Sequence, residues 1–342
     1  AVDSVGIDPH GHNHEQSIYS ESRFLFPRGS VGDLLPLNDA AVEGALVETD
    51  VTDGHEQGSI ECALTYTSHF TGFSAVRRHG LMQGLGLNSR LLEELVAQRN
   101  LFRMFPQACL ANAIFPANFS FLGRSYTEDL VPSFDREQVE AGLTLDGRPV
   151  RLLGAERHGF EELFTLAEIN KNIFVHAARE AGVPLLSYAD VSADRALTSS
   201  MMHELEARLN FKFLDQAPLP ARTPDDAAAI LAELAAEFPF IFYKYQIPDL
   251  VSHSGRPELA REVFATIEEF VHGVLVRIDA EKTIIVVTSD HGHLEQVNYH
   301  EGHPKNRVPT WYFGPQALEH ADRLRTPEAI FQRFAQLASI VS

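Results

Sequence analysis

Residues 283–292 read TIIVVTSDHG, and this stretch decides the fold. Its first part is an uninterrupted run of β-branched apolar residues, which is typical of a strand covered on both faces. Residues 240–243, which read FIFY, have the same character. Strands of this kind favour a sheet that lies between two layers of helices.

Working outward, further short apolar runs alternate with amphipathic stretches. The expected strands are residues 45–51, 108–115, 184–188, 238–245 and 283–288, with 308–313 at the edge of the sheet. The expected helices are residues 168–181, 224–236 and 257–278. The second of these has the clearest start, because Thr223 can cap it and Pro224 suits its first position. This alternation predicts an α/β fold, and we expect a doubly wound, mostly parallel sheet.

Residues 116–222 do not follow this alternation of strands and helices. Residues 116–222 contain few runs that resemble buried strands, and they include an expected hairpin of 143–145 and 150–152 around a turn at 146–147. A chain of 342 residues is long enough for about two domains or for one large unit with an insertion. We therefore predict a core made of residues 1–115 and 223–342, interrupted by a small cap of residues 116–222.

Composition argues against several classes of protein. The net charge is −19 and no long basic run occurs, so binding to a nucleic-acid backbone is not expected. No apolar stretch approaches the ~20 residues of a membrane span. With only Cys62 and Cys109, a disulfide framework is not expected, and we predict a cytoplasmic location. The alternative is a targeting segment removed upstream, because residues 1–3 read like the end of a buried strand whose earlier part is missing.

Acidic residues and histidines stand at four separate places, each near an expected strand end, where open α/β sheets hold their sites. These residues are Asp3, Asp249, His253, Asp290, His291 and His303. One Asp-His pair alone is more often a capping residue beside a surface histidine. Together, three carboxylates and three imidazoles suit divalent ions such as Zn²⁺ or Mn²⁺, and two ions rather than one. Two cations would also give an acidic protein a cationic site for an anionic substrate.

The order and spacing of these pieces resemble the alkaline phosphatase superfamily, and most closely its branch of cofactor-independent phosphoglycerate mutases and phosphopentomutases. The resemblance rests on residues 2–6 (VDSVG), on Asp249 and His253, on residues 288–292 (TSDHG) and on residues 302–309 (GHPKNRVP). It spans nearly the whole chain and implies an alkaline-phosphatase-like core. It also implies two ligand sets, the first of Asp249, His253 and His303, the second of Asp3, Asp290 and His291.

The resemblance also places the nucleophile, and here the sequence departs from the family. Members carry a Ser, a Thr or a modified Cys ten residues before the Gly of a Thr-Gly pair, and counting back from Gly72 gives Cys62. A cysteine here is similar to the sulfatases, but Leu64 and Tyr66 replace the residues associated with the sulfatase modification, so we expect an unmodified thiol.

An unmodified Cys62 is chemically coherent. A helix N-terminus and metal cations would lower its pKa below the free value of ~8.5, which would make it both nucleophile and metal ligand. A sulfur ligand would also favour Zn²⁺ over Mn²⁺. Alternatives stay open: Thr65, Thr67 or a metal-bound water could attack instead, or the site could bind its ligand without a covalent step.

The remaining candidates concern the substrate, for which we expect a small anionic ester. Lys244, Lys305, Asn306 and Arg307 could hold its oxygens. The leading hypothesis is a two-metal hydrolase or transferase that acts on a phosphate ester or phosphodiester through a covalent enzyme intermediate. The alternatives are a phosphomutase, a sulfatase-type ester hydrolase, and a non-catalytic metal-binding or ligand-binding protein. The sequence indicates no oligomeric state and gives no role to His293.

Overall fold

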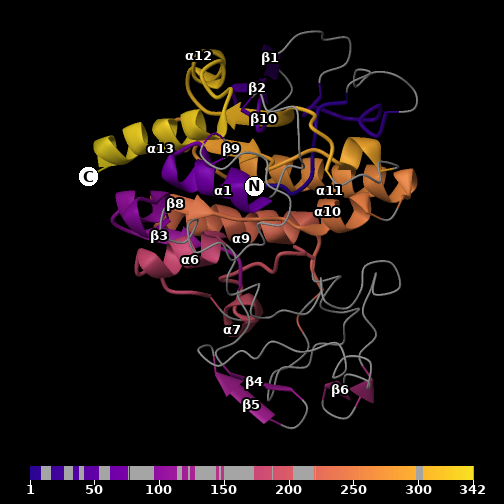
Figure 1. Ribbon diagram of the computed structural model, residues 1–342, viewed down its shortest axis with the longest axis vertical. Coiled ribbons are helices and arrows are strands. Elements are labelled where there is room, and N and C mark those ends of the chain that lie inside the picture. Colours follow the sequence, from indigo (N-terminus) through magenta and orange to yellow (C-terminus); the bar gives the residue numbers. More distant parts are fainter. Residues whose placement is uncertain are drawn as a thin grey trace.

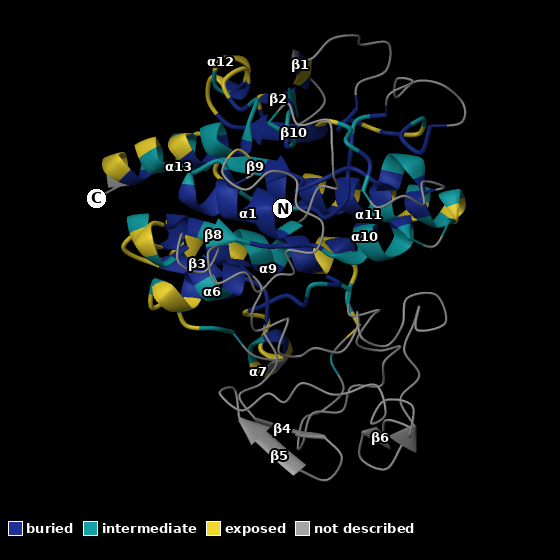
Figure 2. Ribbon diagram, in the orientation of Figure 1, coloured by how far each residue is buried: buried dark blue, intermediate teal, exposed yellow. Residues whose placement is uncertain are grey.

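The structure, a computed structural model, describes residues 1–8, 17–26, 34–37, 42–53, 62–75, 77, 96–113, 118–121, 124–127, 144–145, 148–149, 173–186, 188–202, 219, 221–253, 255–297 and 303–341. Helices, a central sheet and further helices form three layers, which confirms a mixed α/β architecture (Figure 1). Buried residues concentrate in the sheet and on the inner faces of the helices (Figure 2).

Two groups of strands make up the sheet. Four strands pair in the order β1 (Leu34–Leu37), β2 (Gly44–Thr49), β10 (Val308–Phe313) and β9 (Ile285–Thr288), all antiparallel. The strands β3 (Ala108–Leu110) and β8 (Phe240–Phe242) pair in parallel. Val2 joins the two groups, because it bridges in parallel to Tyr245, just beyond β8, and to Ser289, just beyond β9. Figure 1 shows the N-terminus between β9 and β8.

The expectation of a mostly parallel sheet therefore holds only for β3, β8, Val2 and β9, and the sheet as described is mixed. The doubly wound arrangement stays a prediction. The position expected for 308–313 was wrong, because β10 lies between β2 and β9 rather than at an edge. The side chains of β10 pack into both helical layers, because Trp311 lies in one buried cluster and Tyr312 in another. Its interior position comes from backbone pairing on both sides, which the side chains alone do not specify.

Helices cover both faces of the sheet. On one face α9 (Pro224–Glu237) packs against α11 (Pro257–Leu275), over Trp311 of β10 and Tyr243, which directly follows β8. The other face carries α1 (Cys62–Thr71), α6 (Ile173–Glu180), α13 (Pro327–Val341) and the 3-10 helix η1 (Leu101–Met104). The helix α12 (Ala317–Ala321) packs on β2 and β10.

Local sequence explains the best-defined helix start. The side chain of Thr223 accepts a hydrogen bond from the Asp226 backbone N–H, and the Asp226 carboxylate accepts one from the Thr223 backbone N–H, which together form a capping box. Pro224 occupies the first turn, as predicted. The helix expected at 257–278 ends at Leu275. The helix expected at 168–181 corresponds to α6, and residues 168–172 lie outside the part of the chain that the structure describes.

The predicted cap region holds two antiparallel hairpins, which lie below the layered core in Figure 1. They are β4 (Asn118–Phe121) with β5 (Arg124–Thr127), and β6 (Thr144–Leu145) with β7 (Arg148–Pro149). The second is the predicted hairpin, with its return strand two residues earlier than expected. The expected strand 184–188 is reduced to a bridge between Leu186 and Ala113, and α7 (Tyr188–Ser192) follows.

The cap boundaries stay a prediction, although α6 lies inside the predicted range and packs on α1 in the core. Among the described residues, no helix combines the length and apolarity needed to cross a membrane.

Candidate metal centre

The topology brings the candidate residues to one edge of the sheet. The short strand at Val2 and the strands β8 and β9 are parallel, so their carboxyl ends meet there. Asp3 directly follows Val2, and Asp290 comes two residues after the end of β9. Asp249 lies on α10 (Ile247–Ser252), the helix that comes after β8. Because β10 runs antiparallel to β9, the segment before it returns to the same edge and carries His303.

The first group of side chains, which we call the outer cluster, contains Asp249, His253, His293 and His303. One ligand atom from each lies within 4.8 Å of the others. The Nε2 atoms of His253 and His303 lie 3.5 and 3.9 Å from Asp249 Oδ1. Burial alone would raise the pKa of Asp249, but its hydrogen bond with His253 and the nearby imidazoles lower that pKa well below the usual range.

His293 is the member of the outer cluster that sequence reasoning missed. Its ring centroid lies 4.6 Å from that of His253, and it is buried, whereas the other three members are half-buried. It stands two residues after His291, at the start of the 3-10 helix η4 (Leu294–Gln296). The alternating histidines of 291–293 (HGH) were the available signal, but the spacing alone does not say where the second ring points.

The second group, the inner cluster, contains Asp3, Cys62, Asp290 and His291, again with ligand atoms within 4.8 Å of one another. Cys62 is the first residue of α1, and its Sγ lies 3.2 Å from His291 Nε2. The same Nε2 lies 3.7 Å from Asp3 Oδ1 and 3.7 Å from Asp290 Oδ2. The structure thus unites the second predicted ligand set with the predicted nucleophile.

The donor atoms of both clusters fit a bound cation. Both carboxylate oxygens of Asp290 and Oδ1 of Asp3 are buried and have no hydrogen-bond partner in the described part of the chain. Such atoms cost free energy unless a partner satisfies them. An ion bound at ~2.0–2.3 Å would place its ligand atoms within about 4.6 Å of one another, close to the spread observed here.

The chain's own groups raise the pKa of the Cys62 thiol well above its ordinary value. Burial is the main cause, and the carboxylates of Asp290 and Asp3 add to it. Burial and Asp290 likewise raise the pKa of Asp3, whereas His291 and Lys244 outweigh burial at Asp290 and lower its pKa to about 2. The predicted thiolate therefore depends on bound cations, because burial and the neighbouring carboxylates disfavour the charged form of the thiol.

Ser4 connects the two clusters. Its hydroxyl donates a hydrogen bond to Asp249 Oδ1 at 2.5 Å and lies 3.1 Å from Nδ1 of His291. Its backbone φ is 58°, a conformation that costs energy for a residue other than glycine. The rings of His291 and His303 also stack with centroids 3.8 Å apart. Ser4 and the stacked rings of His291 and His303 therefore lie between the inner and outer clusters, and we call these three residues the shared wall.

Glu295 supports this wall and was not predicted. Its buried carboxylate accepts hydrogen bonds from the backbone N–H groups of Gly6 and His293, at 2.8 and 3.0 Å, and from Nδ2 of Asn306 at 2.8 Å. A Cβ on Gly6 would lie 2.1 Å from Glu295 Oε1, and one on Gly292 would lie 2.4 Å from it. The two glycines therefore make room for this carboxylate. Burial outweighs its hydrogen bonds and raises the pKa of Glu295 to about 7.

The four predicted substrate-binding residues lie in different surroundings. Lys244 is buried, with Nζ 2.8 Å from Asp3 Oδ2 and 4.8 Å from the centre of the Tyr66 ring, so it belongs to the inner cluster. Asn306 supports Glu295, and Lys305 is half-buried beside it. Arg307 is exposed and its Nη1 lies 3.3 Å from Glu48 Oε2, and its role in substrate binding stays a prediction.

The two threonines considered as alternative nucleophiles lie outside both clusters. The hydroxyl of Thr67 donates a hydrogen bond to the Ala63 carbonyl inside α1, at 2.6 Å. Thr65 is fully buried in the same helix. Neither joins the groups that could hold a metal ion among the described residues, whereas Cys62 does.

Comparison with known proteins agrees with this geometry. Residues 222–340 match the model of the Metalloenzyme superfamily. These residues are a Metalloenzyme superfamily domain. The Metalloenzyme domain contains all four members of the outer cluster, together with Asp290 and His291 of the inner one. The predicted resemblance at the level of this superfamily is therefore confirmed.

Similarity to curated proteins is weak and partial. The chain is 28% identical over 101 residues to the 2,3-bisphosphoglycerate-independent phosphoglycerate mutase of Pyrococcus abyssi. This alignment covers 29% of this chain and 24% of that protein. The chain is 32% identical over 89 residues to the enzyme of the same name from Clostridium novyi, covering 24% and 17%. The matches thus span about a quarter or less of these relatives' length. The solved structure of PH0037 protein from Pyrococcus horikoshii is 16% identical, with a TM-score of 0.32, over 49% of this chain and 46% of that one.

Proposed function

We propose that this protein binds one divalent cation in each cluster and transfers the phosphoryl group of a small anionic phosphate ester. The observation that carries the proposal is the position of Cys62, a thiol at the start of α1 and inside the inner cluster. The Metalloenzyme domain and the buried, unpartnered oxygens of Asp290 support the metal ions. The weak homology to phosphoglycerate mutases supports phosphoryl chemistry.

The donor set favours zinc, with manganese as the alternative. Imidazole and thiolate ligands suit Zn²⁺, and the single carboxylate of the outer cluster leaves it rich in nitrogen. When bound, two cations would stabilise the negative charge on the attacking and leaving groups of an in-line displacement at phosphorus. Asp249, His253, His293 and His303 would hold one ion, and Asp3, Asp290, His291 and Cys62 the other.

Cys62 would act as the nucleophile. Its thiol releases a proton to solvent when the site is loaded, and the thiolate attacks the phosphorus atom. A P–S bond forms while the P–O bond to the leaving alcohol breaks, and the departing oxygen takes a proton from water. A hydroxyl group then attacks the phosphorus and gives its proton to solvent, a new P–O bond forms, and cleavage of the P–S bond restores the thiolate.

Lys244 would position the inner cluster. Its buried ammonium group holds one oxygen of Asp3 and leaves the other free to bind an ion. Asp3 and Asp290 outweigh the effect of burial and raise the pKa of Lys244, so the positive charge is kept. This charge partly offsets the carboxylates beside the incoming phosphoryl group. Of the other predicted substrate-binding residues, Lys305 and Arg307 stay proposed contacts of the substrate, and Asn306 would act through Glu295.

The experiment that tests the covalent step is rapid acid quenching during turnover, followed by mass spectrometry of the peptide that contains Cys62. We expect a phosphoryl group on Cys62 in the metal-loaded protein. Cys109 is the matched control, because it is a buried thiol on β3 outside both clusters. Turnover with an unmodified Cys62 at every quench time would contradict the covalent mechanism.

A second candidate function is phosphomutase activity, which the names of the matched relatives favour. The two candidates differ in the acceptor of the phosphoryl group. Released inorganic phosphate would identify a hydrolase, whereas transfer to a substrate hydroxyl without released phosphate would identify a mutase. Turnover of sulfate esters alone would favour a sulfatase, and two bound metal ions without turnover of any ester would favour a binding protein.

A further inference from the structure

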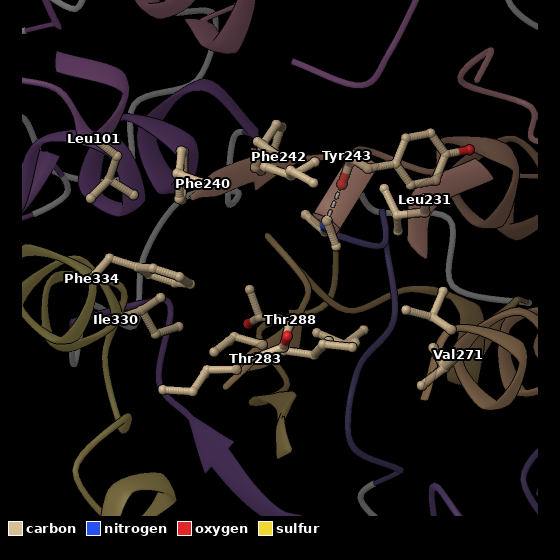
Figure 3. Close-up of a pocket in the computed structure, with 18 of the residues that line it drawn as sticks. Leu101, Leu231, Phe240, Phe242, Tyr243, Val271, Thr283, Thr288, Ile330 and Phe334 are labelled. Atoms are coloured by element: carbon tan, nitrogen blue, oxygen red, sulfur yellow. Dashed lines mark hydrogen bonds between the residues drawn. The ribbon is translucent and has the colours of Figure 1, made fainter. Parts of the chain in front are cut away.

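The strand β9 leads from an apolar interior into the metal centre. Its residues line an apolar cavity of about 360 Å³ together with Phe240 and Phe242 of β8 (Figure 3). Just beyond β9, residues 290–293 (DHGH) supply Asp290 and His291 to the inner cluster and His293 to the outer one. One short segment therefore contributes to both clusters, and its last residue decides how many nitrogen ligands the outer cluster offers.

The position of His293 is fixed through its backbone. Its N–H donates a hydrogen bond to Glu295 Oε2 at 3.0 Å, and its carbonyl accepts one from the Gln296 N–H at 2.8 Å. His293 is only 1% exposed, whereas the other three members of the outer cluster are half-buried. The imidazole of His293 therefore closes the buried side of the outer cluster, and the other three members form its open side.

We propose that His293 makes the outer cluster selective for Zn²⁺ over Mn²⁺, an inference that rests on the proposed binding of one ion in each cluster. With His293, the outer cluster offers three imidazole nitrogens and one carboxylate oxygen. Four ligands of this kind complete the tetrahedral shell that Zn²⁺ takes in proteins. Without His293, two nitrogens and one oxygen remain, and solvent has to supply the rest of the shell.

The selectivity follows from the type of donor and from the space around the ion. Imidazole nitrogen suits Zn²⁺, whereas carboxylate, carbonyl and water oxygens suit Mn²⁺. An octahedral shell of oxygens is typical of Mn²⁺, so the outer cluster would have to admit further oxygen ligands for this ion. The buried ring of His293 occupies the side on which a water molecule would otherwise complete that shell. Both effects favour Zn²⁺.

The test compares the binding of Zn²⁺ and of Mn²⁺ by the parent chain, His293→Asn and His293→Gln. Both substitutions exchange an imidazole nitrogen for an amide oxygen, the first near the position of Nδ1 and the second near that of Nε2. We expect the affinity for one of the two Zn²⁺ ions to fall by roughly 10²-fold or more, the upper range for groups that only orient a ligand. Mn²⁺ affinity should change by less than about tenfold, because the new oxygen suits this ion.

The visible spectrum of bound Co²⁺ gives a second measurement that does not depend on activity. Four-coordinate Co²⁺ absorbs visible light far more strongly than six-coordinate Co²⁺, so both variants should lose part of the absorption that the parent shows. The inner cluster is the same in all three chains, so the difference between spectra reports the outer cluster. Asp290→Asn, which should keep only the outer ion, gives the spectrum of that ion with His293 unchanged. Six-coordinate Co²⁺ in this chain would overturn the proposal without any change at His293.

The exposed His272 on α11 provides the matched control, and His272→Asn should bind all three ions like the parent chain. Circular dichroism of the metal-free chains checks that the variants are folded. Equal losses of Zn²⁺ and Mn²⁺ affinity in the His293 variants would overturn the proposal, because His293 would then be a ligand without selectivity. Unchanged binding would overturn it as well.

Failure of this inference is distinguishable from failure of the proposed function. A parent chain that holds two ions and carries the phosphoryl group on Cys62, but whose metal preference is the same in the His293 variants, would contradict the inference alone. A parent chain that binds neither Zn²⁺ nor Mn²⁺ would contradict both.

Discussion

The outer and inner clusters lie side by side but are built in opposite ways. All four outer members come from residues 222–340, and three of them are half-buried imidazole or carboxylate groups. The inner cluster takes Asp3 and Cys62 from the first part of the chain and is mostly buried. A local, partly open cluster suits an ion that meets solvent and substrate. A buried cluster assembled from distant segments suits an ion that activates the nucleophile.

Removing the nucleophile should produce the largest difference between the clusters. In Cys62→Ala, we expect the rate of phosphoryl transfer to fall roughly 10⁴-fold or more, because the covalent step is lost. The metal content of the outer cluster should not change. Initial rates and elemental analysis of the same preparation test this.

Cys62→Ser sharpens the test, because its hydroxyl can still attack and should restore part of the activity. A Cys62→Ala variant that keeps the original rate would show that another group attacks.

Exchanging one carboxylate in each cluster should separate the two ions. In Asp290→Asn, the inner cluster loses a ligand charge, and we expect its affinity for Zn²⁺ to fall by roughly 10²-fold or more, whereas the outer ion stays bound. Asp249→Asn should have the reverse effect. Isothermal titration with Zn²⁺, supported by the metal content per chain, distinguishes the two variants. Simultaneous loss of both ions in both variants would mean that the clusters form a single site.

A smaller effect is expected from the residue that supports the shared wall. Glu295→Gln keeps the size of the side chain but turns an amide group toward donors that need an acceptor. We expect Zn²⁺ affinity to fall by roughly 10- to 100-fold, as for other groups that orient metal ligands. The loss should be greater at the outer cluster, because Glu295 holds the backbone of His293. The exposed Glu281 provides the control, and Glu281→Gln should bind Zn²⁺ like the parent protein.

The smallest effect should come from a change that touches neither cluster. Thr223→Ala removes the capping box of α9 and should lower the free energy of unfolding by about 1 kcal/mol, with no change in metal affinity. Chemical denaturation and a Zn²⁺ titration of the same variant measure both quantities. A change in Zn²⁺ affinity would show that the clusters respond to general loss of stability, so that lower affinity in the other variants would not identify a metal ligand.

Sequence reasoning succeeded where local chemistry decides the outcome. The start of α9 follows from Thr223 and Pro224, and Asp290 with His291 follows an apolar run of β-branched residues that is typical of a strand. It failed where distant segments meet. The pairing of β10 with both β2 and β9 cannot be read from its six residues, which would also suit an edge strand.

Contacts inside the site were also missed where they join residues that are distant in the sequence. Lys244 and Asp3 are far apart in the sequence, and an isolated lysine in an apolar strand gives no sign of its partner. Glu295 lies in a polar stretch, where an acidic residue ordinarily faces solvent. Its burial becomes evident only in the folded structure, where the segments that carry Gly6 and Asn306 donate hydrogen bonds to its carboxylate.

The hydroxyl of Ser4 contacts both clusters, so we expect ion binding at one cluster to affect ion binding at the other. It contacts Asp249 of the outer cluster and His291 of the inner one, so an ion that orders either side chain also restricts the other. We therefore expect the second ion to bind to a partly ordered site, so that loading is cooperative. Ser4→Gly removes the hydroxyl while keeping a residue suited to a φ of 58°. Its Zn²⁺ isotherm should lose this cooperativity, and the two ions should then bind independently.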